Sequence, residues 1–358
     1  MEYFDKTYHP PGTAAGTLIT SDVAVPEDLT IRLIHYTENE ISEKASVTSE
    51  QCRPSLTEKG LTWVHLQGSF MAETIKEIGR TFELHPLALE DILNKGQRPK
   101  TEEYDDLLFV IMTMPCVINE IVTIQQVSIF MRDNYIVSFH NGDEDPFEPL
   151  RRNLRKSGSR IRHQHADYLL YAMLDLLIDL GYPMLEEYGN KIEAIEEQLL
   201  SESISKTTLT DIHRIRHDLI LLRRNLWPQR EVIRGLLRND GGFIKESTLL
   251  YLRDCYDHTI QILELMENYR EMATSMLDIY VSSTSNHLSE VMRVLTMIAT
   301  VFIPLTFVVG LYGMNFSHAD SPWAMPELHW YYGYPIVLVI MLTITVGMLI
   351  YFKKKKWL

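Results

Sequence analysis

The chain is short of cysteine and of positive charge. Its three cysteines, Cys52, Cys116 and Cys255, lie far apart without a Cys-x-x-Cys spacing, which argues against a disulfide framework and against a thiolate zinc site. Residues 1–292 hold 29 Lys and Arg against 46 Asp and Glu. Because this acidic stretch repels polyanions and attracts cations, we expect no nucleic-acid partner.

Common enzyme motifs are missing as well. The chain contains no Walker loop, no His-Glu-x-x-His, no Gly-x-Ser-x-Gly and no Gly-x-Gly-x-x-Gly, which are short sequences that carry phosphate, zinc, acyl or dinucleotide chemistry. The N-terminus also lacks a basic start followed by an apolar core, so it predicts no cleavable signal peptide. We therefore expect a protein that is not an enzyme and whose acidic part stays in the cytoplasm.

Two long apolar runs lie near the C-terminus, Val294–Leu311 and Pro335–Phe352, each close to the roughly 20 residues needed to cross a bilayer. Residues 312–334 contain no Lys or Arg, whereas Arg293 precedes the first run and four lysines follow the second. The positive-inside rule therefore places both ends in the cytoplasm of a two-span protein of the cell membrane. The expected parts are a first span at 293–312, an outer loop at 313–334, a second span at 335–352 and a basic tail at 353–358.

The N-terminal part, residues 1–160, mixes short β-rich runs with helical stretches and predicts an α/β domain with a largely antiparallel or mixed sheet. The expected strands are Ile31–His35, Thr62–Leu66, Leu107–Met112, Val122–Met131 and Tyr135–Phe139. Residues 161–242 predict a helical hairpin with helices at Asp167–Leu200 and Thr208–Leu237, the second disturbed at Pro228.

A long stalk helix is predicted at residues 243–292, continuing into the first span. From Phe243 to Ile303 there is no Gly or Pro, and a helix of that length would measure about 90 Å. The weak helix formers of Val281–Asn286 leave a second reading open, in which two helices meet at a break. A continuous helix would carry motion of the acidic domain directly into the membrane.

One face of this helix, here called the seam, carries mainly small, polar and flexible side chains spaced four and three apart. Its members are Ser285, Ser289, Met292, Thr296, Ala299, Ile303, Thr306 and Gly310. The seam is suited to line a water-filled pore, but it is equally suited to close packing between two helices. Because two spans cannot enclose a pore, conduction would require a ring of identical subunits.

The sequence Tyr312-Gly313-Met314-Asn315-Phe316 stands at the outer end of the first span, and the outer loop continues with Met325-Pro326-Glu327-Leu328. Together with the second span and the Lys353–Leu358 tail, this arrangement resembles the CorA family of magnesium transport proteins. The resemblance extends over essentially the whole chain. Two features depart from the family pattern, a longer outer loop at Ser317–Ala324 and Ser289 where asparagine is frequent.

The resemblance implies a homopentameric funnel with an α/β cytoplasmic domain, a long helical stalk and two C-terminal transmembrane helices. Mg²⁺ would be both the permeant and the regulatory ion, with cobalt or nickel as further permeant ions and no organic cofactor. Gly313, Met314 and Asn315 would form an outer ring that receives the ion with its water shell, because Mg²⁺ loses its waters reluctantly. Glu327 would attract cations to this entrance.

By the same resemblance, a constriction and two regulatory ion sites fall on particular residues. The constriction would be built by Met292, Leu295, Ala299 and Ile303, with Thr306 as a polar ring just inside the entrance. The regulatory sites between subunits would use Asp91 and Asp254, with Glu90 and Asp175 as ligands of the second site. Magnesium bound there would hold the ring closed, and its loss would free the subunits to move.

Two rival readings stay open at this point. His213 and His217 lie four apart on a predicted helix, a spacing able to hold a transition metal, which keeps a zinc transporter of similar build in view. A two-pass membrane sensor that binds a ligand without conducting is the other. Ion flux into liposomes separates both readings from magnesium conduction.

Overall fold

The computed structural model describes residues 12–18, 29–94, 96–118, 121–142, 144–200, 207–314, 325 and 330–357. The chain forms two compact units, Met1–Met276 and Leu277–Leu358. Of the residues singled out above, Asn315 and Glu327 lie outside the described residues, as does the loop at 317–324.

A seven-stranded sheet organises the first unit, with the strand order β2-β1-β3-β7-β6-β5-β4. Its strands are β1 Thr30–Tyr36, β2 Ile41–Ala45, β3 Leu61–Gln67, β4 Lys100–Tyr104, β5 Leu107–Ile118, β6 Ile121–Met131 and β7 Tyr135–His140. Neighbouring strands are antiparallel except for β3 and β7, which pair in parallel with Val64 opposite Val137. The mixed sheet predicted from the sequence is confirmed.

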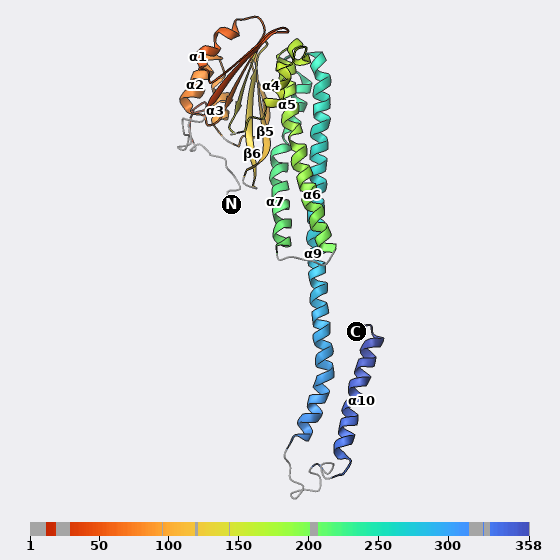
Figure 1. Ribbon diagram of the computed structural model, residues 1–358. Coiled ribbons are helices and arrows are strands. Elements are labelled where there is room, and N and C mark those ends of the chain that lie inside the picture. Colours follow the sequence, from red (N-terminus) through yellow and green to blue (C-terminus); the bar gives the residue numbers. More distant parts are fainter. Residues whose placement is uncertain are drawn as a thin grey trace. The chain divides into compact units, whose positions relative to one another are not determined.

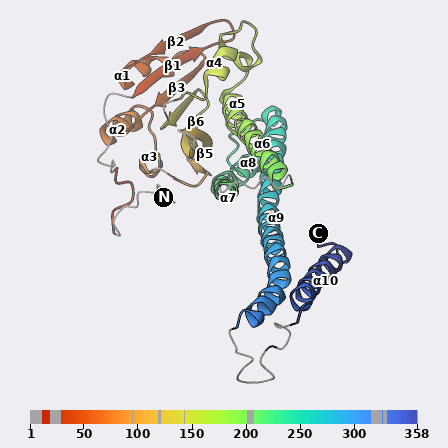
Figure 2. The ribbon, with the colours of Figure 1, turned by 60° about the horizontal axis from the view of Figure 1, so that its bottom comes forward.

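Helices cover both faces of this sheet (Figures 1 and 2). One face carries α1 Ser49–Cys52, α2 Ala72–Thr81 and α3 Pro86–Leu93. The other carries α5 Ala166–Asp179, α6 Gly181–Leu200, α7 Thr208–Leu226 and α8 Gln229–Arg238, which contact β4, β5, β6 or β7. The remaining short elements are α4 Glu148–Arg155 and two 3₁₀ turns, Pro54–Leu56 and Arg160–His163.

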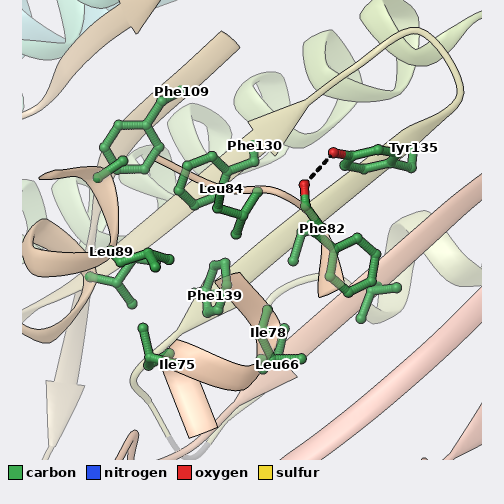
Figure 3. Packing of buried hydrophobic residues seen from close by; sticks show 14 of the residues in the cluster. Leu66, Ile75, Ile78, Phe82, Leu84, Leu89, Phe109, Phe130, Tyr135 and Phe139 are labelled. Atoms are coloured by element: carbon green, nitrogen blue, oxygen red, sulfur yellow. Dashed lines mark hydrogen bonds between the residues drawn. The ribbon is translucent and has the colours of Figure 1, made fainter. Parts of the chain in front are cut away.

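The core under α2 and α3 is rich in aromatic side chains (Figure 3). Phe109 and Phe130 stack with ring centroids 4.4 Å apart, and Phe139 meets Phe130 edge to face. Tyr135 packs against Phe82 and donates its hydroxyl to the Phe82 carbonyl at 2.7 Å. This anchored core fixes α3, and hence the carboxylates that α3 carries, relative to the sheet.

The helical hairpin differs from its prediction in one respect. The expected helix at Asp167–Leu200 is divided at Leu180 into α5 and α6, because Pro183 has no N–H to donate to the carbonyl of Asp179. Gly181 starts α6 where a Cβ would stand 3.3 Å from Ile262. The disturbance predicted at Pro228 is confirmed, since α7 ends at Leu226 and α8 begins at Gln229.

One helix, α9 Glu246–Tyr312, runs for 67 residues through the end of the first unit and into the second. It passes Val281–Asn286 without a break and includes Pro304, so the two-helix reading is wrong. In the second unit, α10 Gly333–Lys354 follows and runs opposite to the end of α9 (Figures 1 and 2).

Three helical stretches are long and apolar enough to cross a membrane, but they differ in burial. In Ala166–Leu200, half of the most apolar window is buried, where α5 and α6 pack on the sheet. In α9 none of the corresponding window is buried, and in α10 only 6% is. Apolar side chains left uncovered by their own chain require lipid or a partner subunit.

Candidate functional sites

The seam lies on the part of α9 that its own chain leaves uncovered. Met292 and Ile303 of the seam are each more than half exposed. Bulky residues outside the seam, such as Leu295 and Phe307, are more than half exposed as well. Exposure alone therefore does not select one face as a pore lining. The helical spacing does place Met292, Leu295, Ala299, Ile303 and Thr306 on one side of the helix.

The hydroxyl groups of the seam threonines donate hydrogen bonds to backbone carbonyls of their own helix. The Thr296 hydroxyl donates to the carbonyl of Met292 at 2.7 Å, and that of Thr306 donates to the carbonyls of Phe302 and Ile303 at 3.0 and 2.9 Å. A hydroxyl that donates back to its own helix has only lone pairs left to offer outward. Such oxygens accept hydrogen bonds from the waters of a hydrated cation.

Local backbone hydrogen bonds close the C-terminal end of α9. The Gly313 N–H donates to the carbonyl oxygen of Val309 at 2.9 Å, and the Met314 N–H donates to the carbonyl oxygen of Leu311 at 3.3 Å. A Cβ at position 313 would stand 3.1 Å from the Val309 carbonyl oxygen, a closer approach than most Cβ atoms make. Gly313 and Met314 thus directly follow the last turn of α9.

Asp91 and Glu90 lie on α3, and both already have partners. Asp91 accepts hydrogen bonds from Lys100 Nζ at 2.7 Å and from Gln97 Nε2 at 2.8 Å, while Glu90 accepts one from Gly16 N–H at 2.6 Å. Burial raises the pKa of Asp91, against the opposing effect of Lys100. A metal ion at Asp91 would therefore compete with a tethered ammonium group.

Asp175 and Asp254 lie on the other face of the sheet, around His258. His258 Nδ1 is 3.3 Å from Asp179 Oδ1 and 3.9 Å from Asp175 Oδ1, and its Nε2 is 3.9 Å from Asp254 Oδ2. Burial, followed by the neighbouring Asp179 carboxylate, raises the pKa of Asp175 to about 6. These carboxylates are crowded without enough nearby positive charge.

The four residues expected at regulatory sites therefore form two separate groups within one chain. Asp91 and Glu90 belong to α3, whereas Asp175 belongs to α5 and Asp254 to α9. Because α3 and α5 cover opposite faces of the sheet (Figures 1 and 2), one ion cannot join the two groups inside a protomer. An ion shared by Asp91 and Asp254 would need a second copy of the chain.

Sequence reasoning missed Asp179 and the role of His258. A signal was present, because Asp175 and Asp179 are four apart on one helix, and so are Asp254 and His258 on another, a spacing that puts both members on one face. By contrast, no described residue joins the His213–His217 pair on α7 as a third potential metal ligand. Over the described ranges, Asp175, Asp179 and His258 form the one group of at least three potential metal-ligand side chains.

Comparisons with known proteins identify the relatives of this chain. The family model described as "CorA-like Mg2+ transporter protein" matches residues 58–354. The chain is 39% identical over 349 residues to the cobalt/magnesium transport protein CorA of Thermotoga maritima, covering 97% of each protein. It is 33% identical over 295 residues to the putative metal ion transporter YfjQ of Bacillus subtilis, covering 82% of this chain and 89% of that one.

A solved structure agrees at the level of the fold. The complete CorA magnesium transporter of Methanocaldococcus jannaschii superposes with a TM-score of 0.76 at 21% identity, covering 92% of this chain and 98% of that one. The α/β unit, the long helix and the C-terminal helix are thus a known arrangement.

Proposed function

The chain belongs to the CorA family of Mg²⁺ transporters, and we propose that it moves hydrated Mg²⁺ across the cell membrane through a pore lined by α9. The observation that carries this proposal is the C-terminal part of α9, which is wholly uncovered in its apolar window and has a seam of outward-facing hydroxyl oxygens. Mg²⁺ keeps most of its waters at protein sites, so a lining that accepts hydrogen bonds from those waters suits it. The seam contains no carboxylate that would bind the ion tightly.

The burial of the three candidate helices supports two spans per chain. The α9 stretch at 293–312 and the α10 stretch at 335–352 cross the bilayer, whereas α5 and α6 remain in the cytoplasmic unit because half of their apolar window is already buried. The absence of Lys and Arg from 312–334 supports a topology in which this loop faces outward and both termini lie in the cytoplasm.

A closed ring of subunits completes the pore, and the family resemblance favours a homopentamer. Met292, Leu295, Ala299 and Ile303 would narrow the channel and exclude water when closed, with Thr306 as a polar ring above them. Asn315, with Gly313 and Met314, would receive the hydrated ion at the entrance, and Glu327 would raise the local cation concentration.

Regulation would act through ions bound between cytoplasmic units. Asp91 of one subunit and Asp254 of its neighbour would share Mg²⁺, with Glu90 and Asp175 assisting a second ion. The partition of these residues between two faces of the sheet supports a site that needs two subunits. Because Asp254 and Met292 stand on the same unbroken helix, loss of the ion can move the constriction.

Purified protein in liposomes tests the proposal. We expect Mg²⁺ influx that Asn315→Ala lowers by at least about tenfold, because even one lost hydrogen bond to a charged group costs about 1.5 kcal/mol, and the ring repeats the loss in every subunit. Asn268→Ala, an exposed asparagine on the cytoplasmic part of the same helix, is the matched control. Influx of Zn²⁺ but not Mg²⁺, no influx at all, or equal influx in the Asn315 variant would refute magnesium conduction.

A further inference from the structure

A cavity of about 510 Å³ lies where the loop between α3 and β4 meets the junction of α7 and α8. Its wall is formed by residues 96–99 of the loop, by Ile220 and residues 223–225 of α7, and by Trp227 and Pro228. Cavities of roughly 300–1,000 Å³ are the usual size of small-molecule sites. The proposed pore and the proposed regulatory sites use none of these side chains.

The charged side chains of this wall are all arginines. Arg98 comes from the loop, and Arg223 and Arg224 come from the last turn of α7. Among the described residues no carboxylate lines the cavity, although the whole chain carries a net charge of −14. Guanidinium groups bind phosphate oxygens through paired hydrogen bonds. The cavity therefore favours a phosphorylated anion, which the rest of the acidic surface repels.

The loop that carries Arg98 is held in place before any ligand binds. The Gln97 N–H donates to Gln126 Oε1 at 3.2 Å, and the Gln97 side chain donates to Asp91 Oδ1 at 2.8 Å. Arg98 itself is exposed and has no ion-pair partner in the described part of the chain. A fixed backbone with an available guanidinium group lowers the ordering cost of binding.

An apolar surface lies beside these charges. Trp227 is 37% exposed and Ile220 is 50% exposed. The guanidinium groups of Arg223 and Arg230 lie over the indole, 5.5 and 5.1 Å from its ring centroid, and Arg223 also pairs with Glu267 of α9. Nucleobases stack on aromatic rings and on guanidinium planes. Inorganic phosphate would contact the arginines alone and leave this apolar surface uncovered.

We propose that the cavity binds a nucleoside triphosphate, with the phosphate groups at Arg98 and Arg224 and the base against Trp227 and Ile220. Glu267 already balances the charge of Arg223, so Arg223 holds the indole in place, whereas Arg98 and Arg224 contact the phosphates. Because Arg98 and Arg224 come from different segments of the chain, a ligand with more than one phosphate group can engage both. The site lies within the first unit and does not require that the chain conducts ions.

Equilibrium dialysis of the full-length protein in detergent against radiolabelled ATP tests the site. EDTA is present throughout, so that no metal ion bridges ATP to the carboxylates. We expect saturable binding of about one ATP per chain. Arg98→Gln should weaken it more than about tenfold, because a hydrogen bond between charged groups commonly contributes at least that factor. Arg234→Gln is the matched control, since Arg234 is an exposed arginine of α8 outside the cavity.

Competition with unlabelled tripolyphosphate tests the nucleoside part of the ligand. Tripolyphosphate should compete at least about fivefold less well than ATP, because stacking of a base on an aromatic ring commonly contributes that factor. Trp227→Leu should remove this difference by weakening the binding of ATP alone. Equal competition by the two anions, together with unchanged ATP binding in Trp227→Leu, would overturn the assignment of a nucleotide.

The site as a whole would be overturned by three results: no saturable ATP binding, unchanged binding in Arg98→Gln, or an equal loss in Arg234→Gln. Because Arg98 is exposed and unpaired among the described residues, its substitution leaves the fold intact. The measurement involves no ion flux, so its failure leaves the proposed function standing. A protein that shows no Mg²⁺ flux but binds ATP through Arg98 refutes only the proposed function.

Discussion

Asp91 and Asp175 are both partly buried aspartates on helices that flank the sheet, yet their surroundings supply very different positive charge. The Asp91 side chain is 16% exposed and is paired with Lys100 at 2.7 Å. The Asp175 side chain is 26% exposed and has a second aspartate one turn away, and among the described residues His258 is its one basic neighbour within ion-pair distance. Asp91 is therefore paired with a lysine of its own chain, whereas Asp175 has no lysine or arginine partner in the described part of the chain.

This difference indicates how the two proposed regulatory ion sites can bind with different strength. A metal at Asp91 must displace an ammonium group, so its apparent affinity is lowered by the competition. A metal at Asp175 relieves a repulsion that exists without it. The comparison therefore predicts weak, reversible binding of the regulatory Mg²⁺ at Asp91, which suits a sensor of an abundant ion, and tighter binding of the second ion at Asp175.

The largest expected effect comes from removing the shared regulatory ion altogether. In liposomes, Asp91→Ala combined with Asp254→Ala should keep Mg²⁺ influx active at internal magnesium concentrations that shut the parent, with the half-inhibiting concentration raised at least about tenfold, a change of about 1.4 kcal/mol. Asp106→Ala with Asp240→Ala removes two exposed aspartates, each paired with a surface arginine, and should leave inhibition in place. Unchanged inhibition in the first double variant would rule out these residues as the regulatory site.

A smaller effect tests directly whether the Lys100 ammonium group competes with Mg²⁺ for Asp91. Lys100→Met frees Asp91 for metal, so the half-inhibiting Mg²⁺ concentration should fall by about fivefold, because a partly exposed ion pair contributes up to about 1 kcal/mol. The readout is the same influx assay at graded internal magnesium. Lys191→Met, which breaks an exposed pair with Glu187, is the control. A half-inhibiting concentration that stays the same or rises would show that Lys100 does not compete with Mg²⁺.

The sequence predicted most of the fold because most elements have strong local patterns. Five strands were predicted near their observed positions since their apolar runs are buried, as in β3 and β7. The strands β2 and β4 were missed because Ile-Ser-Glu-Lys-Ala and Lys-Thr-Glu-Glu-Tyr are charged edge strands. Edge strands carry such charges to discourage further pairing, and this hides their β propensity.

The sites were less predictable than the fold. The seam followed from helical spacing, which is local information. The Lys100 partner of Asp91 and the meeting of Asp175 with His258 depend on tertiary packing, since the latter residues are more than 80 positions apart. Two pairs with a spacing of four pointed to α5 and α9 as ligand-bearing helices, but no local pattern says that the two helices face each other.

The smallest predicted effect is on folding stability and concerns Asp175 alone. The pKa of Asp175 rises from 3.8 to about 6 on folding, so the folded state favours the protonated form. Stability from this group is present below pH 3.8 and is lost as the pH rises through about 6. In metal-free protein, Asp175→Asn should therefore raise the melting temperature well above pH 6 and leave it unchanged below pH 3.8.

The expected rise is about 2–4 °C, which corresponds to roughly 1 kcal/mol in a unit of this size. This is less than the full pKa shift implies, because Asp175 is 26% exposed and solvent screens its charge. Thermal denaturation followed by tryptophan fluorescence measures it, with the exposed Asp240→Asn as control. A rise of equal size at both pH values would trace the effect to packing, and no rise at either would mean that the Asp175 carboxylate already has a compensating cation.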